Sequence, residues 1–234
     1  MKIRPASSIL LLAAVAGCSS ILPKAPPEAF YDLMYEAERV DCHAGYGEPV
    51  EVWNFTAAGP YDRTDMVVTS GREVSFSRGH QWVDRPGVLV AQKLIRDLSG
   101  GRLFTVAVSP RDPAGAPLQL TGNLYRFAWM KDGGSAHASF EADVILRRTG
   151  APAQVLLHNR YDLNSEPVST TDDASAFARA MSGVVARFSA LLRRDLCAAG
   201  RSVSGSTVPG KPRSFTRRPR CDPATAMRRI VSSR

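Results

Sequence analysis

The sequence predicts an α+β domain, in which a mixed, largely antiparallel sheet of about five to seven strands is flanked by two main helices. Three long runs of alternating apolar and polar residues, at 118–131, 136–148 and 153–163, predict an antiparallel meander. Apolar residues at helical spacing follow residue 84 and residue 173, and they predict the helices. With 44% hydrophobic and 22% charged residues among 234, the chain suits one globular core.

The first half of the predicted domain alternates short strands with one helix. The segment 50–57 is apolar on both faces, which is typical of an interior strand, and 66–77 reads as a hairpin. Asp84 is the predicted N-cap of a helix that has Pro86 in its first turn, where the missing N–H costs nothing. Gly100 is expected to end this helix.

The second half is predicted to be mainly sheet, closed by a long helix. A strand at 103–109 precedes the meander, and the alternation is clearest in 136–148, where one face is rich in alanine. That face either lines a lipid groove or receives a closely packed helix. A capping signal at 170–173 precedes a helix of about 24 residues that ends near Cys197 and should cover the sheet.

The net charge of +8 is confined to the C-terminal tail. The chain has 30 Lys and Arg and 22 Asp and Glu; nine of the basic residues and one of the acidic ones lie in 198–234, which leaves 21 of each in 1–197. A neutral body has no field that attracts a polyanion, which disfavours a nucleic-acid-binding domain. The tail has few apolar residues and is predicted to be disordered. It either contacts anionic headgroups or is an inert, solvated extension.

The N-terminus has the features of a lipoprotein signal. Two basic residues precede an eight-residue apolar run at 9–16, which is too short to span a bilayer. The sequence VAGC that ends at Cys18 resembles the bacterial lipobox, so residues 1–17 are predicted to be a signal peptide and Cys18 the acylated first residue. An ordinary secretory signal with an incidental cysteine is the alternative.

The compartment and the domain limits follow from this anchor. An acylated chain is held at the periplasmic face of a bacterial membrane. Ser19 after the cysteine favours the outer membrane over the inner one. The Pro-rich stretch 18–49 has no sustained period and is predicted to be a tether, followed by a domain at 50–197.

Three cysteines remain in a compartment that permits disulfides, namely Cys42, Cys197 and Cys221. Three pairings are open, and each leaves one thiol unpaired. A bond between Cys42 and Cys197 would join the two ends of the body and close a long loop, which stabilises by about 5 kcal/mol in chain-entropy estimates. A bond between Cys197 and Cys221 would pin only the tail, and three free thiols are a further alternative.

Motifs for catalysis and metal binding are absent from the sequence. The four histidines form no HExxH pair, no two cysteines have CxxC spacing, and there is no GxSxG or phosphate-binding loop. We therefore expect a protein that is not an enzyme and that needs no metal or cofactor. A periplasmic hydrolase would require His80 or His158 to face a serine or a carboxylate in a pocket.

Several strings in the body resemble one family. They are FYDL at 30–33, the stretch REVSFSRGHQWVDRPGVLVAQKLIRDL at 72–98, LTGNLYRF at 120–127 and the closing helix at 172–196. Together they resemble the ABC-type transport auxiliary lipoproteins, which include the paraquat-inducible lipoprotein and the lipoproteins encoded beside MCE (mammalian cell entry) lipid-transport systems. The resemblance covers roughly 18–197, and it implies a fold similar to the N-terminal domain of the TolB translocation protein.

The resemblance implies a non-catalytic periplasmic subunit that associates with an ABC permease, its ATPase and an MCE-domain protein, either as one copy or as a homo-oligomer. Its most specific element is Trp82, followed by Asp84 and Arg85, at the start of the first helix. These three are candidate partner-binding residues; packing of Trp82 under the helix is the alternative. The rival function is an envelope-assembly or Tol-like outer-membrane lipoprotein.

Overall fold

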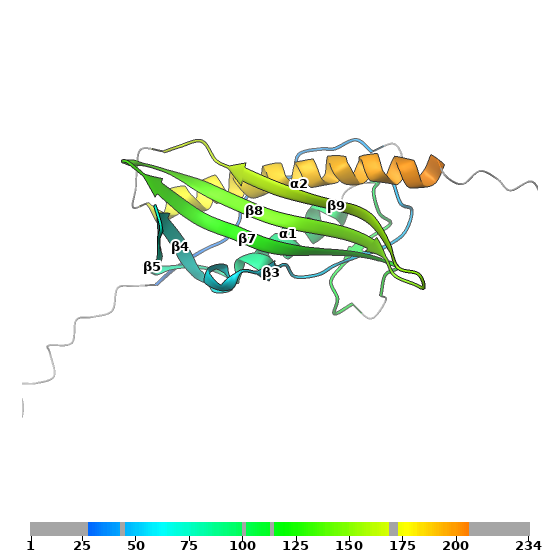
Figure 1. The fold of residues 1–234 in the computed structure, drawn as a ribbon, viewed down its shortest axis with the longest axis horizontal. Coiled ribbons are helices and arrows are strands. Elements are labelled where there is room, and N and C mark those ends of the chain that lie inside the picture. Colours follow the sequence, from blue (N-terminus) through cyan, green and yellow to red (C-terminus); the bar gives the residue numbers. More distant parts are fainter. Residues whose placement is uncertain (1–27, 43–44, 100–101, 113–114, 169–172, 206–234) are drawn as a thin grey trace, which may run out of the picture.

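A computed structural model of the chain describes residues 28–42, 45–99, 102–112, 115–168 and 173–205 (Figure 1). Within these residues one mixed sheet of nine strands is joined by two α-helices, which confirms the predicted α+β class. Five strands have six or more residues and the other four have two or three, so the short ones account for the excess over the predicted number. The strands are β1 (Ala29–Tyr31), β2 (Val50–Val52), β3 (Thr56–Ala57), β4 (Asp65–Ser70), β5 (Glu73–Trp82), β6 (Ala107–Val108), β7 (Leu118–Asp132), β8 (Ser135–Arg148) and β9 (Gln154–Asn164).

Strand β7 organises the sheet. One edge of β7 pairs with β8 along its whole length, and the other edge pairs in turn with β2, β3 and β4. The three antiparallel pairings, β4 with β5, β7 with β8 and β8 with β9, are the long ones, whereas each parallel pairing joins only two or three residue pairs. The sheet is therefore antiparallel over most of its length, as predicted.

The helices α1 (Pro86–Ser99) and α2 (Ala174–Gly205) lie on the same face of the sheet (Figure 1). The alanine-rich face of β8 is fully buried and receives α2, with the rings of Phe140 and Phe188 4.7 Å apart. Close packing of a helix, and not a lipid groove, thus explains these small side chains. The buried residues of that face are Ala136, Ala138, Phe140, Ala142, Val144 and Leu146.

The predicted strand 50–57 is interrupted by Phe55. Its amide donates to the carbonyl of Gly87, 3.1 Å away, so the backbone is drawn to the first turn of α1. Its ring fills the space above Gly122, where an added Cβ would lie 2.3 Å from ring carbon Cε1. Only glycine fits at position 122 beneath the Phe55 ring. The predicted strand is therefore divided into β2, before Phe55, and β3, after it. The predicted strand 103–109 is likewise shorter, because only β6 is extended.

The domain begins earlier than predicted. Residues 28–42 fall within the predicted tether 18–49, yet β1 pairs in parallel with β5, and Leu33 is completely buried. A three-residue strand is too short to show a period, and its partner is about 50 residues away, so alternation could not reveal it. Residues 18–27 of the predicted tether lie outside the described residues.

The closing helix is longer than predicted. Asp173 caps it by accepting the amide N–H groups of Ser175 and Ala176, whereas residues 170–172 of the capping signal lie outside the described residues. The helix has 32 residues and continues through Cys197 to Gly205, so the predicted tail at 198–234 begins eight residues too early. Alanines at 198 and 199 favour helix, and no breaker ends it sooner. None of the described helices is long and apolar enough to cross a membrane.

Candidate functional site

Trp82 lies in the core, at the point where β5 leads into α1. Its side chain is 1% exposed and packs edge to face against Phe127 and Phe177, with centroid distances of 5.2 and 5.4 Å. A side chain without accessible surface cannot contact a partner directly. The structure therefore assigns Trp82 to packing between the sheet and α2, and the interpretation of Trp82 as a partner-binding residue is not supported by its position.

Asp84 and Arg85 lie between Trp82 and the helix. The carboxylate of Asp84 accepts the amide N–H of Arg85 at 2.7 Å, and the carbonyl of Arg85 accepts from the amides of Val88 and Leu89. The exposed Arg85 guanidinium lies 3.4 Å from the carboxylate of Asp62. Because α1 begins at Pro86, Arg85 and not the predicted Asp84 stands directly before the helix, and the Arg85 side chain stays accessible to a partner.

A segment without regular structure, residues 32–42, crosses the two helices and is called the crossing segment below. At its end, Cys42 and Cys197 form a disulfide with their Cα atoms 5.7 Å apart, so the segment is bonded covalently to α2. In its middle, the carbonyl of Glu38 accepts from Arg193, and its carboxylate pairs with Arg194. Cys221 lies outside the described residues.

The buried carboxylate of Asp97 holds the crossing segment against α1 through a hydrogen bond from Tyr35. Asp97 on α1 accepts the hydroxyl of Tyr35 at 2.8 Å, the hydroxyl of Ser189 at 2.6 Å and the guanidinium of Arg96 at 2.8 Å. Burial, and then the charge of Asp97, raise the pKa of Tyr35, so this phenol keeps its proton and donates. A pocket of about 930 Å³ with both acidic and basic walls lies beside this cluster. Among the described residues the hydroxyl of Ser189 donates to Asp97 and has no hydrogen bond to a histidine, the usual base of a hydrolytic serine.

The remaining candidates for chemistry include His80, which lines a pocket of about 210 Å³ together with Ser77 and Asp173. Nδ1 of His80 lies 3.1 Å from the hydroxyl of Tyr31, and no hydrogen bond joins His80 to a serine or a carboxylate within the described part of the chain. The hydroxyl of Ser182 donates to the carbonyl of Ala178 inside α2. In the described ranges no three His, Cys, Asp or Glu side chains gather as they would around a metal ion. His43 and Cys18 lie outside the described residues.

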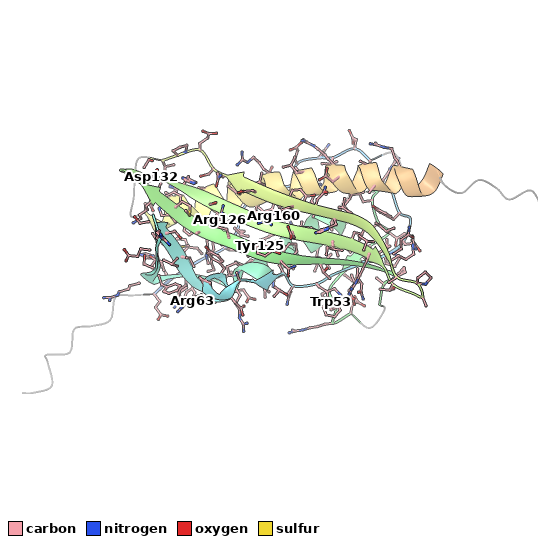
Figure 2. All side chains as sticks on the ribbon, in the orientation of Figure 1. Trp53, Arg63, Tyr125, Arg126, Asp132 and Arg160 are labelled. Atoms are coloured by element: carbon pink, nitrogen blue, oxygen red, sulfur yellow. A yellow bond between two sulfur atoms is a disulfide. The ribbon has the colours of Figure 1, made fainter. Side chains whose placement is uncertain are left out.

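The face of the sheet that the helices leave open carries a connected group of charged and aromatic side chains, which we call the outer-face cluster. It spans three strands, and Figure 2 shows Tyr125, Arg126 and Arg160 in this region of β7 to β9. Its members are Tyr125, Arg126, Glu141, Asp143, Arg160 and Asp162.

Glu141 is the centre of the outer-face cluster. It is only 7% exposed and is flanked by two guanidiniums, with Nη2 of Arg126 at 2.6 Å and Arg160 in hydrogen-bond contact. The hydrogen bond and charge of Glu141 raise the pKa of Arg160. A buried carboxylate of this kind is stabilised only while at least one cationic partner remains in place.

Around that centre, Tyr125 and the acidic residues complete a preorganised surface. The hydroxyl of Tyr125 donates to Asp143 at 3.1 Å, which raises the pKa of this phenol, and the Arg160 guanidinium lies 5.0 Å above the Tyr125 ring. Asp162 pairs with Arg126 at 3.4 Å. Arginine and tyrosine held in fixed positions are the side chains that contribute most to protein recognition.

The sequence did not indicate the outer-face cluster. Its polar positions on β8 were visible from alternation, but their partners depend on a register shift between Leu124 and Arg126 of β7. This bulge brings Arg126 opposite Glu141, and no local sequence pattern predicts such a bulge. The only signal was the run of charged residues on one side of 136–148, which is also what a solvated face would show.

Two helices on one face of a curled mixed sheet, with paired charges on the other face, define this chain as a one-sheet α+β domain. The chain belongs to the family described as ABC-type transport auxiliary lipoprotein component, whose model matches residues 31–192. This confirms the resemblance found in the sequence. The match begins within β1, where the structure also places the start of the domain. Membership identifies the chain as an auxiliary lipoprotein of ABC-type transport, which implies a membrane-anchored protein.

Solved structures share the fold at low sequence identity. A protein of Xanthomonas campestris, XCC0632, described under the family model DUF330, has a TM-score of 0.66 and 16% identity, and the match covers 76% of this chain and 99% of that one. An uncharacterized protein has a TM-score of 0.54 and 16% identity, with 73% and 99% covered. At such identities the likeness concerns the fold alone. The chain matches none of the curated proteins.

Proposed function

We propose that this protein is a lipid-anchored, non-catalytic accessory subunit of an ABC-type system that transports lipid across the cell envelope, and that it docks on its partner through the outer-face cluster. The observation that carries the proposal is the family match over residues 31–192. The absence of catalytic and metal-binding motifs from the sequence agrees with an auxiliary role.

The anchor in this proposal is Cys18. Two or three acyl chains on one residue hold a protein at a bilayer, because each buried methylene contributes about 0.8 kcal/mol. With the domain limits taken from the structure, the proposed organisation begins with a signal peptide at 1–17 and a tether from residue 18 to the start of β1. The domain follows and ends with α2, and a basic tail comes after it. The proposed location is the periplasmic face of a membrane, with the outer membrane favoured by Ser19.

The partners in this proposal are an MCE-domain protein and the ABC permease with its ATPase. An anchor that confines the domain to one membrane face raises its effective concentration for a partner that reaches across the periplasm. The outer-face cluster suits such docking, since Arg160 and Tyr125 are exposed and are held in place by Glu141 and Asp143. The domain would dock on the lipid conduit without cleaving any bond.

Affinity purification of the full-length protein from detergent-solubilised membranes tests this function. We expect the ATPase, the permease and the MCE protein to be enriched with it, as measured by quantitative mass spectrometry. Arg160→Ala should reduce that enrichment at least tenfold. The variant should keep its fold, because Glu141 retains its ion pair with Arg126.

The matched control is Arg147→Ala, an exposed arginine of β8 that bonds to Gln119 and lies outside the cluster. It should leave the enrichment unchanged. Enrichment of β-barrel assembly or Tol components in place of the ABC system would establish the rival function. Undiminished enrichment with Arg160→Ala would refute docking through the outer-face cluster.

A further inference from the structure

Four exposed apolar side chains gather at the corner of the sheet formed by β1, β4 and β5. They are 41% to 59% exposed, and they make up four of the nine large exposed hydrophobics among the described residues. We call this group the corner patch. Its members are Phe30, Val74, Phe76 and Val83. Single exposed apolar residues are ordinary, but a group of them on one corner indicates a contact surface.

Strand register places this group on one face. Phe30 lies opposite Gln81 in the parallel pair of β1 and β5, and Gln81 lies opposite Asp65 of β4. Tyr31 lies opposite Trp82, whose ring packs against Phe177 of α2, so Tyr31 and Trp82 face the helices. Phe30, the neighbour of Tyr31, therefore points to the other side of the sheet.

That side is the one away from the helices. Val68, the neighbour of Val67, lies opposite Trp129, whose ring is 5.2 Å from that of Phe177 on α2. Val67 and its partner Phe76 consequently face outward. Val83 follows directly after β5, and its amide donates to the carbonyl of Tyr31, which keeps it beside Phe30.

One member of the corner patch, Phe30 on β1, lies close in sequence to the proposed anchor. Ten residues separate Cys18 from Ala29, the first residue of β1. Fully extended, this stretch reaches at most about 40 Å. In Figure 1 the β4 and β5 corner lies at one end of the long axis, and the C-terminal end of α2 lies at the other. The corner can therefore reach the bilayer through a short connection, whereas the end of α2 lies at the opposite end of the domain.

We propose that the corner patch rests in the interface of the bilayer that carries the anchor. The inference deepens the proposed function and depends on acylation of Cys18. Aromatic and aliphatic side chains are favoured at the headgroup level of a membrane. Two points of attachment, the acyl chains and the patch, then fix the orientation of the domain, with the far end of α2 directed into the periplasm.

The contact depends on apolar surface and not on charge. Arg63 covers the Phe76 ring at 3.9 Å and pairs with Asp65 at 2.6 Å, and Arg85 pairs with Asp62. Because each of these cations is paired with a carboxylate, the two ion pairs add no net charge to the patch. The contact should therefore form on neutral phosphatidylcholine and should persist at high salt.

Photocrosslinking of the full-length lipoprotein in phosphatidylcholine vesicles tests the patch. Benzoylphenylalanine replaces Phe30 or Phe76 in separate preparations, and lipid adducts are counted by mass spectrometry after illumination. The controls carry the same residue in place of Tyr125, on the same face but in the outer-face cluster, or of Val155, which is exposed on β9. Mass analysis of the Cys18 peptide first verifies the anchor, and thermal melting verifies the fold.

We expect at least tenfold more lipid adducts from positions 30 and 76 than from positions 125 and 155, at both low and high salt. Equal yields at all four positions, or none at 30 and 76, would overturn the inference. Adducts in cells to a protein instead of lipid at these positions would also overturn it, because the patch would then be a protein interface. An unmodified Cys18 would instead refute the anchor in the proposed function.

Discussion

Removal of the bond between Cys42 and Cys197 should lower the free energy of unfolding by about 2–5 kcal/mol. The two cysteines are 155 residues apart, so their bond closes nearly the whole domain into one loop. Without it the unfolded chain gains conformational entropy, and the crossing segment keeps its polar contacts with α1 and α2 and the burial of Leu33 in the core. For a domain of this size each kcal/mol corresponds to about 2–4 °C, so the Cys42→Ala, Cys197→Ala variant should melt about 10 °C lower.

Calorimetry with and without a thiol reductant checks this result. The native protein should lose stability in reductant, and the double variant should not respond to it. Cys221→Ala is the control, because it leaves the described bond intact, and its melting temperature should equal that of the native protein. Equal melting of the native protein and the double variant would show that this bond is not formed in solution.

The second large effect concerns Trp82. Trp82→Ala should cost about 3–5 kcal/mol, because it empties a buried site between Phe127 and Phe177. Trp82→Phe should cost much less. An aromatic ring is retained there, and the indole N–H that is lost makes no hydrogen bond within the described residues.

Urea denaturation measures both changes, and Trp53→Ala is the matched control. Trp53 is largely exposed and donates one hydrogen bond to Glu51, so its loss should cost only about 1 kcal/mol. If Trp82→Ala left stability unchanged but abolished co-purification with the transporter, Trp82 would be a binding residue and the assignment to packing would be wrong.

The elements with strong local patterns could be predicted from the sequence. The strands β7, β8 and β9 and the apolar stripe of α1 were placed within one or two residues, because alternation and helical spacing act over neighbouring positions. Among the short strands, β1 is missing from the prediction, β2 and β3 are merged into one strand, and β6 is predicted too long. Their hydrogen bonds come from distant partners, as in the pairing of β1 with β5 and of β3 with β7.

The candidate site was less predictable than the fold. Trp82 was placed correctly at the entry to α1, but whether it faced a partner or the core depended on Phe127 and Phe177, which come from other elements. The outer-face cluster depends on a bulge in β7 and on two strand registers. Recognition of the family, in contrast, needed only local strings such as 72–98, and the match over 31–192 confirms it.

The most direct test of the account is the chemical state of Cys18 in protein purified from bacterial membranes. Mass spectrometry of the N-terminal peptide should find a chain that begins at Cys18 and carries two or three acyl chains, and Cys18→Ser should move the protein from the membrane fraction to the soluble one. A free thiol at Cys18 in the exported protein, or full recovery of the native protein without detergent, would contradict the account.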